Sequence, residues 1–169
     1  GVTRLRVGDP ELEDTQMGPL VNQAHRRTIE AYVQLGLDEG GTLLAGGRRP
    51  NGTRFERGSY YLPTVFEGLS NRTRLCQEEI FGPVTVVFPF DDVDAVMEAA
   101  NGTEYGLGGG LWTTNLQRAH QMAAAMRSGM VWVNSYKRAN QGSPFGGTGL
   151  SGYGREMGFE AMREYTEAK

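Results

Sequence analysis

The sequence has little of the residue types that build covalent or metal-bound frameworks. Its 169 residues include one cysteine, Cys76, and two histidines, His25 and His120. A single cysteine cannot close an internal disulfide, and one cysteine with two histidines gives too few ligands for an ordinary transition-metal site. We therefore expect no disulfide framework and no metal. Because no charged-then-apolar leader opens the chain, a reducing, cytoplasmic setting is the default expectation.

Long apolar runs and clusters of one charge are also missing. No stretch approaches the roughly 18 apolar residues of a membrane span, which argues against a membrane protein. The 17 basic and 20 acidic residues are mixed and sum to a net charge of −3, so neither nucleic acid nor an anionic membrane is an expected partner. With 38% apolar and 22% charged residues, the composition is that of about one globular domain, or one lobe of a larger protein.

Glycine, in contrast, is abundant. The chain has 25 glycines, about twice the average usage of roughly 7%, and seven of them fall between Gly142 and Gly158. The chain also begins with Gly1 in a charged, featureless run, which is typical of an internal cut through a longer protein. The sequence therefore predicts a fragment.

Apolar spacing and turn residues predict helices that alternate with strands. Helices are expected from Asn22 to the glycines at 40 and 41, from Asp91 or Asp92 to Asn101, and over 115–127, with a helical turn over 74–79. Strands are expected over 42–45, 60–66, 84–90, 107–112 and 130–133. The near-continuous apolar run 84–90 is typical of a central strand buried on both faces. The order predicts the α/β class, with a parallel sheet and helices on both faces.

Ligands of open parallel sheets bind beyond the carboxyl ends of the strands, which makes the loop from Asn134 the first place to look. Within this loop, residues 147–152 (GTGLSG) match the dinucleotide fingerprint G-x-G-x-x-G. No strand directly precedes the match, and its acidic ribose partner, expected about 20 residues further on, would lie at the very end of the chain. The match is therefore interpreted as turn chemistry.

A second candidate is the carboxylate pair Glu78 and Glu79, just before the Gly82 turn. Adjacent carboxylates on a helical turn diverge, so they cannot share a proton. We expect one to be solvated and the other to accept hydrogen bonds from backbone or from a ligand hydroxyl. Cys76 is the only possible thiol nucleophile, but neither histidine is expected beside it, and a buried, inert cysteine is favoured. A cysteine enzyme would require an exposed thiol of low pKa.

Seven blocks of sequence carry a family resemblance. They are residues 7–10 (VGDP), 18–21 (GPLV), 78–84 (EEIFGPV), 104–107 (EYGL), 132–134 (WVN), 143–147 (SPFGG) and 151–156 (SGYGRE). In order and spacing they resemble the carboxyl-terminal part of an aldehyde dehydrogenase, over nearly the whole chain. The resemblance implies that residues 1–169 are the carboxyl-terminal part of the catalytic domain. The Rossmann cofactor domain, the nucleophilic cysteine, the general-base glutamate and the oxyanion asparagine would then lie outside this chain.

The resemblance also implies an activity. That family oxidises aldehydes to carboxylic acids with NAD or NADP: a cysteine thiolate attacks the carbonyl, the thiohemiacetal gives a hydride to the nicotinamide, and a glutamate activates water. The chain would thus be a fragment of such an oxidoreductase, inactive alone, with a small-molecule aldehyde as the substrate of the complete enzyme. The alternative is a non-catalytic binding or assembly module derived from that lobe.

The parent enzyme is expected to be a homodimer or homotetramer. The chain stops at Lys169, where the family continues into a strand that completes a partner subunit's sheet. Assembly through that strand is therefore expected to be compromised.

Matched residue by residue, the resemblance assigns two cofactor contacts and no catalytic residue. Glu79 matches the glutamate that clamps the nicotinamide ribose hydroxyls, and Phe81 matches the aromatic residue that packs beside the nicotinamide. Cys76 occupies a position that is usually small and non-catalytic in the family.

The same matching assigns the substrate contacts. Phe145 matches an aromatic wall of the aldehyde tunnel, and residues 134–142, with Tyr136, Lys137, Arg138 and Ala139, match the variable segment that shapes substrate choice. Lys137 and Arg138 are interpreted either as partners for the carboxylate of a semialdehyde or as solvated loop residues.

Overall fold

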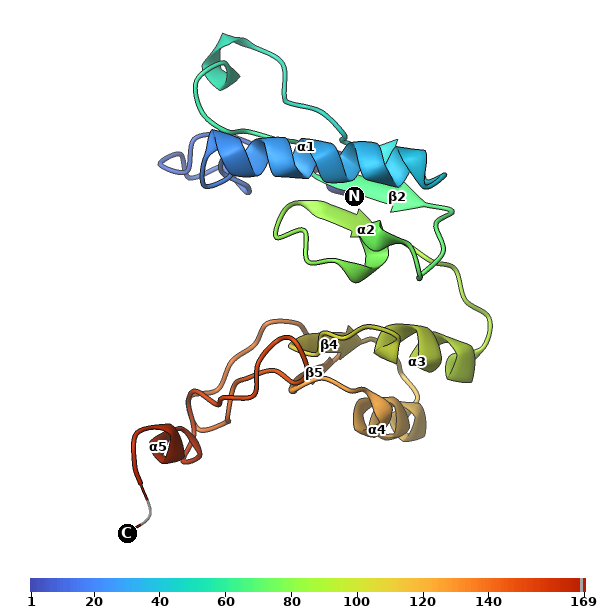
Figure 1. The fold of residues 1–169 in the computed structure, drawn as a ribbon, viewed down its shortest axis with the longest axis vertical. Helices are drawn as coiled ribbons and strands as arrows, with labels where there is room; N and C mark the ends of the chain where they lie inside the picture. Colours follow the sequence, from blue (N-terminus) through green and yellow to red (C-terminus); the bar gives the residue numbers. More distant parts are fainter. Residues whose placement is uncertain (168) are drawn as a thin grey trace. The chain divides into compact units, whose positions relative to one another are not determined.

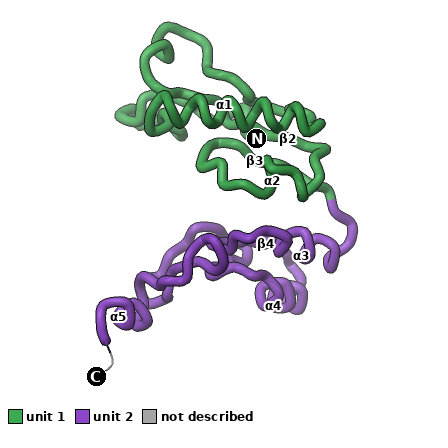
Figure 2. The backbone as a smooth tube through the Cα atoms, in the orientation of Figure 1, with its two compact units in different colours: residues 1–89 green, residues 90–169 purple. Residues whose placement is uncertain are grey.

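The computed structural model describes residues 1–167 and 169, which form two compact units (Figures 1 and 2). Unit 1, residues 1–89, holds the short 3-10 helices η1 (Val2–Arg4) and η2 (Thr53–Phe55), helices α1 (Gln23–Asp38) and α2 (Arg74–Gln77), and strands β1 (Thr42–Ala45), β2 (Thr64–Glu67) and β3 (Val84–Val86). Unit 2, residues 90–169, holds α3 (Val93–Asn101), β4 (Gly108–Leu111), α4 (Leu116–Ala125), β5 (Met130–Val133) and α5 (Ala161–Glu164).

Unit 1 is built on a mixed three-stranded sheet in the order β1-β2-β3. Strand β1 runs antiparallel to β2, with Thr42 opposite Glu67, whereas β2 and β3 are parallel, with Thr64 opposite Val84. The connection from β1 to β2 contains only the three-residue η2, and antiparallel neighbours need no helical crossover. The parallel pair β2 and β3 is joined through α2.

Helix α1 supplies much of the core of unit 1. It begins at the cap Asn22, whose Oδ1 accepts a hydrogen bond of 2.8 Å from the backbone N–H of His25. Its inner face carries Ile29, Val33 and Gly36 at helical spacing, all buried. The core that these residues complete also contains Tyr61, Phe66, Leu69 and Leu75.

Unit 2 contains a parallel pair, β4 and β5, connected by α4 and registered from Gly108 opposite Met130 to Leu111 opposite Val133. Helices α3 and α4 each begin at a capping side chain. Asp92 accepts from Ala95 N–H at 2.7 Å, and Asn115 accepts from Arg118 N–H at 2.9 Å.

The chain is therefore a mixed α/β protein, as predicted, but several details of the prediction were wrong. The sheet of unit 1 is not all parallel, because β1 is antiparallel. The strand predicted over 60–66 begins at Thr64, and the one predicted over 84–90 ends at Val86 and is the edge of its sheet. Within the described residues β3 pairs only with β2, so its side chains are only half-buried or exposed. Leu116, an apolar residue in the helix predicted over 115–127, is 73% exposed in the first turn of α4.

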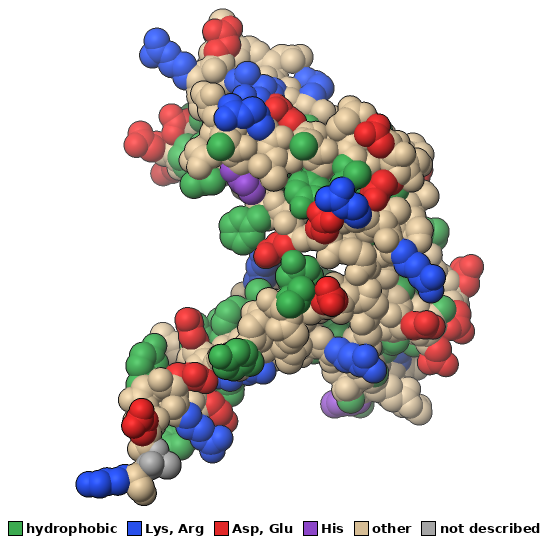
Figure 3. Space-filling model, viewed as in Figure 1, with side chains coloured by type: hydrophobic (Ala, Val, Ile, Leu, Met, Phe, Trp, Pro, Cys, Tyr) green, Lys and Arg blue, Asp and Glu red, His purple; other side chains and the backbone are tan. Residues whose placement is uncertain are grey.

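The described residues carry no helix long and apolar enough to cross a membrane. On the face drawn in Figure 3, acidic and basic side chains are interspersed over both units. This agrees with the mixed surface predicted from composition.

Candidate functional site

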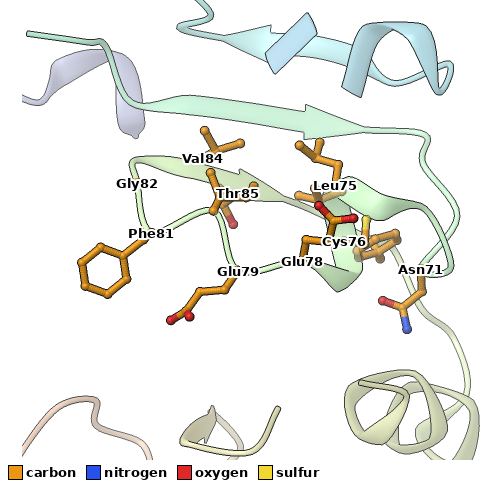
Figure 4. A pocket seen from close by; sticks show the side chains of 12 residues that line it. Asn71, Leu75, Cys76, Glu78, Glu79, Phe81, Gly82, Val84 and Thr85 are labelled. Carbon is orange, nitrogen blue, oxygen red and sulfur yellow. The ribbon is translucent and has the colours of Figure 1, made fainter. Parts of the chain in front are cut away.

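The turn between α2 and β3 forms one wall of an open cavity of about 470 Å³ in unit 1 (Figure 4). The cavity is lined by residues of α2, of this turn and of β3, together with Asn71 and Phe88. Both predicted cofactor contacts, Glu79 and Phe81, are among them.

Glu78 is fixed by neighbouring side chains. Its carboxylate accepts hydrogen bonds from Arg74 Nε at 2.6 Å and Nη2 at 3.2 Å, and from the Tyr32 hydroxyl at 2.9 Å. The hydrogen bond from Arg74, followed by that from Tyr32, holds the pKa of Glu78 below its ordinary value. Glu78 thus links Arg74 of α2 to Tyr32 of α1.

Glu79 has the opposite environment. It is exposed, and among the described residues its carboxylate has no hydrogen bond or ion pair. Figure 4 shows its side chain leaving the turn on the same side as Phe81, whereas that of Glu78 turns toward α2. The two carboxylates diverge as predicted, but the helical turn predicted over 74–79 ends at Gln77, so both lie beyond α2 and not on it. Glu79 is the one that remains able to accept hydrogen bonds from a ligand.

Phe81 presents an aromatic ring beside this carboxylate in an unusual conformation. Its backbone φ is 55°, and the residue is 80% exposed. The left-handed region costs an ordinary L-residue roughly 1–2 kcal/mol. The Phe81 carbonyl accepts a hydrogen bond from His25 Nε2 at 2.8 Å, and the two rings meet edge to face with centroids 6.4 Å apart.

Cys76 lines the same cavity and is half-buried, so it is more accessible than the buried cysteine predicted from the sequence. The Thr73 hydroxyl donates to its Sγ at 3.1 Å. Among the described residues no hydrogen bond joins it to a histidine, and the His25 ring is engaged with Phe81. Nothing in this arrangement activates the thiol.

The predicted substrate segment lies in unit 2, directly after β5. Asn134, at φ 53°, accepts a hydrogen bond from Thr113 N–H at 2.9 Å and donates one to the Thr113 carbonyl at 3.0 Å. Trp132 Nε1 donates to the Arg138 carbonyl at 2.8 Å. These bonds fasten residues 134–138 at both ends.

Between those fastenings the segment presents an aromatic and cationic surface. Tyr136 lies 5.1 Å from the ring of Trp132 and 6.5 Å from that of Trp112, measured between centroids. The Lys137 amine lies 5.8 Å from the centre of the Tyr136 ring. Arg138 and Ala139 are exposed. Neither Lys137 nor Arg138 has an ion pair among the described residues.

The remaining substrate candidate, Phe145, belongs to a separate part of unit 2. It is half-buried, and its backbone exchanges two hydrogen bonds of 2.7 Å with Glu156. Groups of the neighbouring segment 147–152 are hydrogen-bonded to the backbone of Gly106. Thr148 N–H donates to the Gly106 carbonyl at 3.0 Å, and Ser151 Oγ accepts from Gly106 N–H at 3.1 Å. This agrees with the interpretation of that motif as a turn.

Sequence reasoning missed the residues that hold these groups in place. His25 acts on a carbonyl 56 positions away, and no sequence pattern signals such a pairing. Arg74 lies four residues before Glu78, and that spacing on a helical turn was a usable signal for their ion pair.

Comparison with known proteins shows that this mixed α/β chain is similar to part of a class of dehydrogenases. The sequence model of the aldehyde dehydrogenase family matches residues 1–169. The chain is 46% identical over 167 residues to a 2-aminomuconic 6-semialdehyde dehydrogenase of a Pseudomonas species, and 45% identical over 165 residues to a betaine aldehyde dehydrogenase of Rhizobium etli. The chain belongs to the aldehyde dehydrogenase family.

Solved structures agree. PnpE from Pseudomonas sp. WBC-3, crystallised in complex with nicotinamide adenine dinucleotide, superposes with a TM-score of 0.94 at 49% identity, over 98% of this chain and 34% of PnpE. A variant of the Staphylococcus aureus betaine aldehyde dehydrogenase in complex with NAD+ gives a TM-score of 0.94 at 35% identity, over 97% of this chain and 33% of that one. The two curated relatives above are each matched over 98% of this chain and 34% of their own length. The chain therefore spans about a third of the length of these relatives.

Proposed function

We propose that this chain is the carboxyl-terminal part of the catalytic domain of an NAD(P)-dependent aldehyde dehydrogenase, an oxidoreductase that converts an aldehyde to a carboxylic acid. In this proposal the nucleophilic cysteine and the Rossmann cofactor domain belong to segments outside residues 1–169. Membership of the family and the NAD-bound relatives support it. Homodimeric or homotetrameric assembly of the enzyme and a cytoplasmic setting belong to the same proposal.

The observation that carries the proposal is the pairing of a free carboxylate with an exposed aromatic ring at one turn. A ribose offers two neighbouring hydroxyl donors, which suit the unpaired Glu79 carboxylate. A nicotinamide is flat, and the exposed Phe81 ring offers a surface for it to pack against. When bound, NAD(P) supplies the acceptor for the hydride that leaves the aldehyde carbon. Glu79 and Phe81 orient the nicotinamide riboside and take no part in bond making.

On the substrate side, we assign Tyr136, Lys137, Arg138, Ala139 and Phe145 to the path of the aldehyde. Lys137 and Arg138, which have no ion pair among the described residues, suit an aldehyde that carries a carboxylate at its far end. The similarity to a protein named as a semialdehyde dehydrogenase supports the same substrate class.

The cofactor assignment is tested by exchanging one carboxylate at a time in the full-length product of the gene. Glu79→Gln keeps the shape of the side chain but weakens it as an acceptor, so we expect the Kd for NAD+ or NADP+ to rise about tenfold or more, as for a lost charge-assisted hydrogen bond. The matched control is Glu78→Gln, whose carboxylate faces Arg74 and Tyr32. We expect the control to bind the cofactor as the wild type does. Equal affinities in all three proteins would contradict the assignment.

A further inference from the structure

The backbone of Phe81 is held in a conformation that the residue does not adopt by itself. Phe81, at φ 55°, is in the left-handed region, and the residue is 80% exposed, so neither local preference nor burial explains its conformation. Strained conformations persist only where surrounding contacts determine them. The contacts around Phe81 therefore decide how the ring is presented.

Helix α1 supplies the contacts on one side of the turn. Gly82 packs directly onto Ile29, which is fully buried, and a Cβ added at Gly82 would overlap that side chain. Ile80, on the other side of Phe81, packs against the core cluster of unit 1. The residues before and after Phe81 are thus anchored.

His25 fixes the peptide group between those anchors. Its Nε2 lies 2.8 Å from the Phe81 carbonyl oxygen, and this acceptor defines Nε2 as the protonated nitrogen. The His25 backbone is itself held, because its N–H donates to the Asn22 cap at 2.8 Å. The edge-to-face contact of the two rings, inclined at 66°, adds a second restraint on the Phe81 side chain.

We propose that His25 is a positioning residue: it orients the Phe81 peptide and ring at the mouth of the cavity, and so sets how the nicotinamide is received. The assignment rests on the proposed function, in which Phe81 meets the cofactor. In this assignment His25 acts through the Phe81 carbonyl and ring alone. Without its hydrogen bond the Phe81 peptide rotates toward ordinary backbone angles, and the ring moves away from Glu79.

The test uses His25→Ala, which removes the donor, and His25→Gln, whose side-chain amide restores a donor near the position of Nε2. The matched control is His120→Ala, which changes the other histidine, an exposed residue of α4 in unit 2. All variants are made in the full-length gene product with para-fluorophenylalanine in place of Phe81. Fluorine NMR then reports the ring environment without cofactor, and titration with NAD+ and NADP+ gives the affinity.

We expect His25→Ala to shift and sharpen the fluorine resonance and to raise the cofactor Kd by about three- to tenfold, the usual effect of one lost hydrogen bond. His25→Gln is expected to restore most of both signals, and His120→Ala to change neither. An unchanged resonance and affinity in His25→Ala would overturn the inference and leave the proposed function standing. Equal losses in His25→Ala and His25→Gln would also overturn it, since a merely structural role predicts no rescue. A wild-type protein that binds neither cofactor would overturn the proposed function, and the inference with it.

Discussion

Two neighbouring glutamates have different tasks because their surroundings differ. Glu78 accepts hydrogen bonds from Arg74 and Tyr32, whereas Glu79, one residue further, leaves the turn on the same side as Phe81. Their divergence was predicted from a helical turn over 74–79, but α2 ends at Gln77 and Glu78 is extended. Successive side chains of an extended backbone also point to opposite sides. The sequence only partly signals which of the two stays free: the four-residue spacing from Arg74 to Glu78 favours that ion pair, whereas the second partner, Tyr32, lies 46 positions away in the sequence. Only the resemblance to a family singled out Glu79.

The lowered pKa of Glu78 predicts a pH-dependent contribution to stability. Because the folded-state pKa lies below the ordinary value of 4.5, the contribution is present above that value and is lost as the pH falls through the folded-state pKa. Glu78→Gln has no such group. We expect the wild type to unfold at a slightly higher urea concentration than Glu78→Gln at neutral pH, and the two midpoints to converge in acid.

Salt provides the control for that comparison. The ion pair is exposed, so the difference at neutral pH should shrink at high ionic strength. A difference that grows in acid would contradict the assigned cause.

At the scale of elements, α1 has two functions. Its inner face completes the core of unit 1, and its first turn holds Phe81 through His25. The helix and its cap were predictable from Asn22 and from the apolar spacing that follows it. The strand predicted over 84–90 was not correctly bounded, because apolar periodicity cannot show where a chain leaves its sheet. That run crosses the boundary between the two units after Pro89.

The turn between α2 and β3 contacts α1 through Gly82, and this contact makes a prediction for Gly82→Ala. The added methyl group would overlap Ile29 in a filled core, and such overpacking typically costs about 1–3 kcal/mol. We expect urea unfolding monitored by circular dichroism to show that loss in the free energy of unfolding.

The matched control is Gly18→Ala. An added Cβ there lies 3.6 Å from its nearest neighbour, Pro10 Cβ, which is an ordinary contact distance. We expect a near-wild-type free energy of unfolding. Equal effects of the two substitutions would show that α1 does not pack against the turn as described.

The segment after β5 makes a prediction about substrate choice. If Lys137 and Arg138 receive a carboxylate, the double variant Lys137→Gln, Arg138→Gln in the full-length enzyme should lose about ten- to a hundredfold in kcat/KM for a carboxylated aldehyde, as for lost charge-assisted hydrogen bonds. A neutral aldehyde of the same length should be oxidised as by the wild type. Equal losses on both substrates would indicate that the two residues only shape the segment.

At the scale of the whole molecule, the mixed α/β class was predictable from the alternation of helix and strand patterns. The family was predictable from the order of seven short sequence blocks. The division into two compact units was not predictable, because no glycine- or proline-rich linker marks residues 89 and 90. The antiparallel β1 was missed because periodicity carries no information about strand direction. We propose that this chain supplies cofactor and substrate contacts to an enzyme whose nucleophile lies outside residues 1–169.

The most direct test is aldehyde-dependent reduction of NAD+ and NADP+ by the purified 169-residue chain and its Cys76→Ala variant, followed by absorbance. Circular dichroism first establishes that both are folded, and the betaine aldehyde dehydrogenase of Rhizobium etli serves as the positive control for the assay. With a panel of neutral and carboxylated aldehydes, we expect turnover from neither protein. Turnover by the chain that disappears in Cys76→Ala would contradict the claim, because residues 1–169 would then hold both a nucleophile and a working cofactor site.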